Sequence, residues 1–182
     1  MKNQSTIILK ITFFKQVKSL FWFFLFSCTW FGGSYYCLKD VDFTTVSKNI
    51  IAIMIGVVLI FAYATLPALF FHIDYLIRNW KEEYEIGNGK IIKRKKGIEK
   101  IYLFEEISDV FLYLSPPDFA KNILHNNAYD NYHFAKIVMK SGEELFLTSL
   151  LYQSGGIEKI LKNHIKGVPY WREKRRLQRC TR

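Results

Sequence analysis

The chain has 182 residues, which is enough for one small globular domain and a pair of long helices but leaves little room for a second soluble domain. Half of its residues are hydrophobic and 17% are aromatic, yet its formal net charge is +10. One compact soluble domain rarely combines these properties, so the apolar residues must be segregated from the charged ones.

The apolar residues are concentrated in two uncharged runs, from Leu20 to Leu38 and from Ile50 to Phe71. Helices with a rise of about 1.5 Å per residue would make these runs roughly 28 Å and 33 Å long, close to the hydrocarbon thickness of a bilayer. We therefore predict transmembrane helices at about residues 20–38 and 50–72, joined as an antiparallel hairpin. Residues 1–79 would form the membrane anchor.

The distribution of Lys and Arg predicts the orientation of this hairpin. Residues 1–18 hold four lysines and residues 78–96 hold seven Lys or Arg, whereas the connection at 39–49 holds two lysines and two aspartates. Both termini are therefore expected in the cytoplasm, with the chain in the cytoplasmic (inner) membrane. The alternative is a cleaved lipoprotein signal ending at Cys28, but the bulky Phe26 fits that cleavage box poorly.

Two features inside the apolar runs predict local geometry. Pro67 removes a backbone hydrogen bond and should kink the second helix. Gly32, Gly33 and Gly56 offer small surfaces at which the helices could approach each other closely.

After Trp80 the sequence changes to short alternating segments between turn residues, which is typical of strands. Asn88-Gly89 predicts a tight hairpin turn between the first two of them. Strands are predicted at 82–86, 90–96, 98–104, 110–114, 132–140 and 143–148, with a polar excursion at 118–131. Ile157, Leu161 and Ile165 have helical spacing and predict one amphipathic helix that closes the β domain.

The segments YEIGNGKIIKRKKGIEKIYLFEEISDV and YHFAKIVMKSGEELFLTSLL, placed between a two-helix anchor and a closing helix, carry a resemblance. Over about residues 80–167 the chain resembles the pleckstrin-homology-like (PH-like) domains of bacterial membrane proteins. The resemblance implies an α+β fold, a partly open barrel of about seven strands capped by the C-terminal helix. It implies binding of lipid headgroups or peptides and no catalytic residues, although a clean phosphoinositide signature is missing. Residues 168–182 would form a basic C-terminal tail.

The alternating strands and the closing helix supply a core of their own, so residues 80–182 are expected to fold without the anchor. No catalytic constellation stands out in the chain. The four histidines are scattered, and neither H-x-x-x-H nor C-x-x-C spacing occurs. We therefore expect no enzyme activity, no cofactor, no metal and no catalytic residue.

Two basic clusters are candidates for contact with anionic lipid headgroups. They comprise Lys93, Arg94, Lys95 and Lys96 shortly after the membrane exit, and Arg172, Lys174, Arg175, Arg176 and Arg179 near the C-terminus. The alternative is that these charges are solvated and only fix the topology. Nucleic-acid binding is not expected, since the membrane already accounts for the positive charge.

The leading hypothesis is a membrane-anchored cytoplasmic binding or scaffolding module. Its partners would be the lipid bilayer, anionic lipid headgroups, or a membrane protein or peptide. The alternative is a small accessory or immunity-type subunit of a membrane complex that acts through its transmembrane helices.

Overall fold

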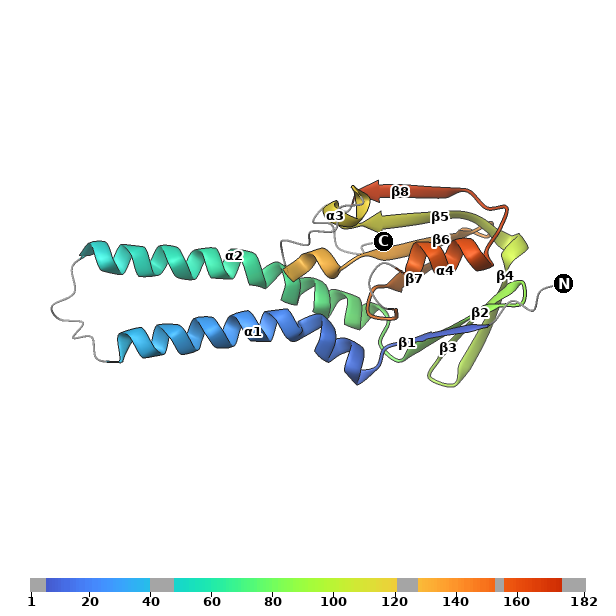
Figure 1. The fold of residues 1–182 in the computed structure, drawn as a ribbon. Helices are drawn as coiled ribbons and strands as arrows, with labels where there is room; N and C mark the ends of the chain where they lie inside the picture. The colour runs from blue at the N-terminus through green and yellow to red at the C-terminus, as the bar shows by residue number, and fades with distance from the viewer. Residues whose placement is uncertain (1–5, 40–47, 121–127, 153–155, 175–182) are drawn as a thin grey trace.

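The computed structural model describes residues 6–39, 48–120, 128–152 and 156–174. A long pair of helices projects from one end of a domain built from two β-sheets and a short helix (Figure 1). Helix α1 (Phe13–Leu38) follows Thr12, whose hydroxyl accepts a hydrogen bond from the Lys15 amide at 3.4 Å. Helix α2 (Lys48–Arg78) lies beside α1, and the rings of Trp30 and Phe61 stack between them with centroids 5.2 Å apart.

The surface of the helix pair is apolar and exposed. Its exposed large side chains include Phe21, Phe24, Phe31, Ile55, Val58, Leu59, Ile60, Tyr63 and Leu66. Within the described residues, one helical stretch, Met54–Arg78, is long and apolar enough to cross a membrane. The last turns of this stretch, with Ala68, Phe71 and Tyr75, are buried against the domain. Both predicted spans therefore stay predictions.

The glycines and the proline of the helix pair were predicted to shape the packing and the course of the helices. A Cβ atom at Gly32, Gly33 or Gly56 would meet nothing within 4 Å, so the two helices do not approach each other closely there, contrary to the expectation from the sequence. Pro67 lies inside α2, which continues through it as one helix.

The strands form two four-stranded sheets. The first has the order β1-β2-β3-β4 and is antiparallel throughout, and the second has the order β7-β6-β5-β8, in which only the β5–β8 pair is parallel. The strands are β1 (Ile7–Lys10), β2 (Glu82–Gly87), β3 (Lys90–Lys95), β4 (Ile98–Leu103), β5 (Ile107–Leu114), β6 (Phe134–Met139), β7 (Glu144–Thr148) and β8 (Tyr170–Lys174). The mixed α+β fold is therefore confirmed.

The predicted hairpin at Asn88-Gly89 is present, and both residues have positive φ angles, of 51° and 76°. The predicted helix is α4 (Ile157–His164). A short helix, η1 (Phe104–Glu106), precedes β5. The polar excursion includes the end of α3 (Pro116–Phe119) and the helix η2 (Ala128–Asn131), while residues 121–127 lie outside the described part of the chain.

Strand β1 was not predicted, and it changes the organisation of the chain. It precedes both helices, yet it pairs with β2 from Ile7 opposite Ile86 to Lys10 opposite Glu83. The helix pair is thus inserted between the first two strands of one sheet. The boundary that we placed at residue 80 leaves this strand out of the domain.

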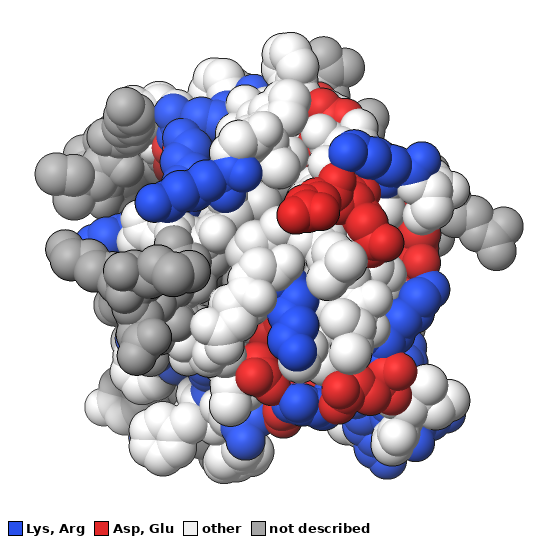
Figure 2. Space-filling model, turned by 90° about the vertical axis from the view of Figure 1, so that its right-hand side faces the viewer, with Lys and Arg blue, Asp and Glu red and all other residues white. Residues whose placement is uncertain are grey.

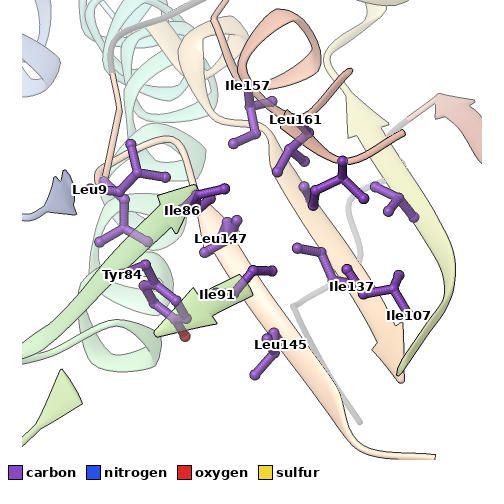
Figure 3. Close-up of a cluster of buried hydrophobic side chains, with 14 of the residues drawn as sticks. Leu9, Tyr84, Ile86, Ile91, Ile107, Ile137, Leu145, Leu147, Ile157 and Leu161 are labelled. Carbon is purple, nitrogen blue, oxygen red and sulfur yellow. The ribbon is translucent and has the colours of Figure 1, made fainter. Parts of the chain in front are cut away.

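The core lies between the two sheets and α4 (Figure 3). Tyr84 and Ile91 from the first sheet meet Leu147 from the second, and all three are fully buried. Helix α4 closes this core with Ile157 and Leu161, which are at most 1% exposed. Leu9 of β1 belongs to the same cluster and is 3% exposed, so the strand before the helices is part of the core.

The first part of the predicted C-terminal tail forms a strand. Tyr170–Lys174 forms β8, which runs parallel to β5 with Val110 opposite Tyr170 and Leu114 opposite Lys174. Residues 175–182 lie outside the described part of the chain.

Candidate functional site

The last turns of α2 are built into the domain. Ala68, Phe71 and Tyr75 of the helix are buried in a second core cluster with Tyr132 and Leu150 of the domain. The imidazole Nδ1 of His72 lies 3.2 Å from the hydroxyl oxygen of Tyr132. The helix therefore ends inside the domain instead of leading to it through a flexible linker.

A buried polar network then joins the end of α2 to both sheets. The side-chain oxygen of Asn79 accepts hydrogen bonds from the Thr148 amide at 3.1 Å and the Thr148 hydroxyl at 2.7 Å. Its side-chain nitrogen donates to the carbonyl of Phe146 and to the carboxylate of Glu82, both at 2.9 Å. One 1%-exposed side chain thus connects helix α2 with strands β2 and β7.

Glu82 is the buried charge of this network. Its carboxylate accepts a hydrogen bond from the Tyr84 hydroxyl at 2.7 Å and forms ion pairs with Lys93 at 3.0 Å and Lys95 at 2.9 Å. Burial by itself would raise the pKa of Glu82, but hydrogen bonds led by that of Lys95 outweigh burial and hold the pKa below its usual value. The same negative charge, together with burial as the largest cause, raises the pKa of Tyr84.

The start of α1 is attached to the domain as well. The Lys15 ammonium donates hydrogen bonds to the carbonyl oxygens of Lys10 and Leu151, which belong to β1 and to the segment after β7. Burial, and to a smaller extent the charge of Lys10, lowers the pKa of Lys15. Both helices are therefore held by the domain at the same end, which we call the junction.

The junction is surrounded by exposed aromatic and basic side chains. Phe13 and Phe14 open α1 and are 79% and 84% exposed, and Trp80 follows α2 and is 50% exposed. The exposed lysines of this rim are Lys10, Lys18, Lys81 and Lys96. Lys96 lies in the β3–β4 turn. Because Lys95 pairs with Glu82, the first residue of β2, this turn lies at the end of the sheet where the chain passes from α2 into β2. Aromatic and basic residues in this arrangement are typical of a membrane–water interface.

The predicted cluster Lys93–Lys96 is largely ion-paired. Arg94 forms ion pairs with Glu85 and Glu99, both at 2.8 Å, and with Glu83 at 3.4 Å. Lys93 and Lys95 share Glu82, whereas Lys96 makes no ion pair with any residue that the structure describes. Four glutamates thus offset most of the positive charge that the sequence suggested for lipid contact.

The second predicted cluster, Arg172 to Arg179, is described only in part, and its described arginine is also paired. Arg172 faces α4 and α3, with its Nε 3.5 Å from the Glu158 carboxylate and its Nη2 donating to the Asp118 carbonyl at 3.3 Å. Lys174 is the last residue of β8, and its side chain is outside the described atoms. Arg175, Arg176 and Arg179 lie beyond the described residues.

The face of the domain turned away from the helix pair carries interspersed charges. Figure 2 shows Lys and Arg side chains next to Asp and Glu across this face, without an extended area of one sign among the described residues. A uniformly basic surface is therefore not present there.

The domain has two hollows among its described residues. The larger, of about 380 Å³, lies between β4 and the β6–β7 turn and is lined by Lys100, Ile101, Tyr102, Glu106, Met139, Lys140, Ser141 and Glu143. The smaller, of about 90 Å³, is lined by Leu114, Asp118, His133, Ile157, Glu158 and Arg172. In the described part of the chain, no group of three or more His, Cys, Asp or Glu side chains could hold a metal ion.

A family model described as a PH domain matches residues 8–160. This chain belongs to that PH domain family. The match starts inside β1, continues across the helix pair and ends in α4, as expected if the first strand of the PH domain precedes the helices. No curated protein and no solved structure matches the chain. The predicted PH-like fold is confirmed, and PH domains are in general binding modules without catalysis.

Proposed function

We propose that this chain is a membrane-anchored binding or scaffolding module whose PH domain is held at the cytoplasmic face of a bacterial inner membrane. The observation that carries the proposal is the apolar, exposed helix pair that projects from the PH domain (Figure 1). So many exposed aromatic and aliphatic side chains are unfavourable in water and favourable in hydrocarbon. Both helices would enter the bilayer from the junction.

The junction supports a fixed position of the domain on the membrane. Phe13, Phe14 and Trp80 would lie at headgroup level, with the lysines of the rim beside them. Since Asn79 and Lys15 attach both helices to the domain, the PH domain would present the same surfaces to the cytoplasm at all times.

The topology can be tested with a reporter enzyme that is active only outside the cytoplasm. We expect activity when the reporter is inserted at Val46, which lies outside the described residues, and none when it is fused after Arg182. As a control, the chain should be recovered in the membrane fraction and should remain there after an alkaline wash. Activity at Arg182 but not at Val46 would contradict the proposal.

We further propose that the rim contacts anionic lipid, with Lys96 as the member of the predicted cluster that remains available. Juxtamembrane basic residues contribute about 1 kcal/mol each near an anionic leaflet. Ion pairs occupy the charges of Lys93, Arg94 and Lys95, so we expect a gain of about 1 kcal/mol from Lys96, roughly a fivefold population shift.

A spin label at position 98, beside the β3–β4 turn, would measure this approach in nanodiscs that contain a nickel-chelating lipid. We expect stronger relaxation of the label in anionic than in neutral lipid at low salt, and loss of this difference at high salt or in Lys96→Glu. A label at position 105, near the opposite end of β4, is the matched control. Equal relaxation in both lipids would leave the cluster without a lipid contact.

A further inference from the structure

Strand β4 has one edge without a neighbouring strand. It is the last strand of its sheet, and no described strand lies on its far side. The amide of Phe104, the residue after β4, donates to the carbonyl of Gly89 at 2.9 Å, so the even-numbered residues of this segment bond toward β3. The backbone groups of Glu99, Ile101 and Leu103 therefore point to the free edge. Among the described residues, the Leu103 amide has a partner there, the carboxylate of Glu106 at 3.1 Å.

Three of the six side chains of β4 are apolar and exposed, and they lie beside the charged Glu99 and Lys100. Ile98, Ile101 and Leu103 are 74%, 52% and 47% exposed. Free edges of soluble sheets are normally protected by bulges, prolines or several charges. Strand β4 pairs with β3 in continuous register over all six residues, so neither a bulge nor a proline blocks its far side.

The 380 Å³ hollow lies directly beside this edge. Lys100 forms an ion pair with Glu143, and the Tyr102 hydroxyl donates to the same carboxylate at 2.7 Å. Lys140 lines the other side of the hollow and makes no ion pair with any described residue. The carboxylate of Glu106 also lines the hollow and accepts the hydrogen bond of the Leu103 amide. Lys140 is the lining cation without an ion pair to a described residue, so it is the group that a carboxylate on a bound segment would meet.

A second copy of this chain does not suit the edge if both copies are anchored in one membrane. Strand β1 runs outward along the direction of the helix pair, whereas β3, the neighbour of β4, is steeply inclined to it (Figure 1). A two-fold axis that pairs two β4 strands in antiparallel fashion reverses the strand direction, and only an axis close to the membrane normal would let both helix pairs enter one bilayer from the same side. An antiparallel pair centred on Lys100 would also place two like charges opposite each other.

We propose that the β4 edge binds an extended segment of a protein partner as an additional strand. Main-chain hydrogen bonds to Glu99 and Ile101 would supply affinity, and alternate side chains would supply specificity. One face of the segment packs apolar side chains on Ile101 and Leu103, and the other directs an acidic side chain toward Lys140. This inference rests on the PH domain acting as a binding module, and the choice of a partner over a second copy rests on both copies being anchored in one membrane.

The test uses the full chain in nanodiscs and two fluorescent nine-residue peptides, one of alternating valine and glutamate and one of alternating valine and lysine. We expect saturable binding of the Val/Glu peptide, at least tenfold tighter than that of the Val/Lys peptide. Amide exchange of β4 should slow when the Val/Glu peptide is bound. Absence of saturable binding, or equal binding of both peptides, would overturn the proposal.

Three variants and one control variant localise the binding. Ile101→Pro removes a donor that faces the free edge while leaving the bonds to β3 intact, and Ile101→Lys adds a charge at the same place. Each should weaken binding of the Val/Glu peptide at least tenfold with little change in thermal unfolding. Lys140→Glu should reverse the peptide preference, whereas Lys166→Glu, at an exposed position after α4, should not. Unchanged binding in both Ile101 variants would refute the β4 edge as the binding site. Loss of membrane insertion with retained peptide binding would count against the proposed function and not against the β4 edge.

Discussion

Contrary to the expectation from the sequence, a fragment of residues 80–182 should lack cooperative unfolding, whereas a chain in which residues 18–66 are replaced by a flexible linker should fold as a water-soluble domain. The fragment loses Leu9 of β1 together with Phe71 and Tyr75 of α2, all of which are at most 3% exposed. The linker chain keeps all three. A linker of about 12 Gly and Ser residues reaches roughly 19 Å, enough to join two neighbouring helix ends.

The expected difference is large compared with the stability of a small domain. Full burial of a large apolar side chain contributes about 1.5–3 kcal/mol, so the three side chains together contribute roughly 5–9 kcal/mol. A typical domain is stable by about 5–15 kcal/mol. Circular dichroism and denaturant unfolding of both proteins would measure the difference, with Leu9→Asp in the linker chain as the matched control. Equal midpoints for the fragment and the linker chain would show that β1 and α2 add nothing.

Asn79→Ala should destabilise the linker chain by about 3 kcal/mol, since a buried polar group left without its hydrogen bond costs about 1–3 kcal/mol and the Asn79 amide serves several. Without it, the Glu82 carboxylate loses one donor, and Thr148 in β7 loses the acceptor of its amide and hydroxyl hydrogen bonds. The variant should also loosen the connection of α2 to both sheets. Denaturant unfolding measures the free energy directly.

A double-mutant cycle with Glu82→Gln separates this network from simple packing. If Asn79 and Glu82 act together, the two substitutions should be non-additive by more than about 0.5 kcal/mol. Thr148→Val removes one further partner and should cost less than Asn79→Ala. Strict additivity of Asn79→Ala and Glu82→Gln would mean that the hydrogen bond between them contributes no coupling.

The central strands and α4 could be predicted from the sequence because their signals are local. Asn88-Gly89 specifies its own turn, and the spacing of Ile157 and Leu161 specifies a buried helix face. Strand β1 could not be predicted in this way. Its four residues have no turn of their own, and they pair with a strand that follows two long helices. Strand β8, with five residues, pairs with β5, more than fifty residues earlier.

The candidate site was only partly predictable for a similar reason. Charge alone selected Lys93–Lys96, but the function of these side chains depends on what lies opposite them. The tight turn at Asn88-Gly89 sets the register that places Glu83 opposite Arg94, so this pairing was available in the sequence. Nothing local marks Asn79, whose partners in β7 come from a hairpin nearly seventy residues later.

A helix pair inserted into the first sheet has a functional consequence. Movement of the helices in the membrane would act directly on β1 through Lys15 and on β2 and β7 through Asn79. Occupation of the β4 edge would in turn stabilise the same sheet. If the proposed membrane anchoring and the proposed partner at β4 hold, binding at the edge and movement of the helices would affect each other through these contacts.

Hydrogen exchange of the full chain in lipid nanodiscs tests the insertion of the helix pair into the PH domain most directly. Peptides that cover β1, residues 7–10, should exchange as slowly as those that cover β2, residues 82–87, because the two strands are paired. Residues 71–79 of α2 should be protected to the same degree, and the Leu9→Asp variant should lose protection in both strands. Fast exchange of residues 7–10 in a chain whose β2 remains protected would contradict the account.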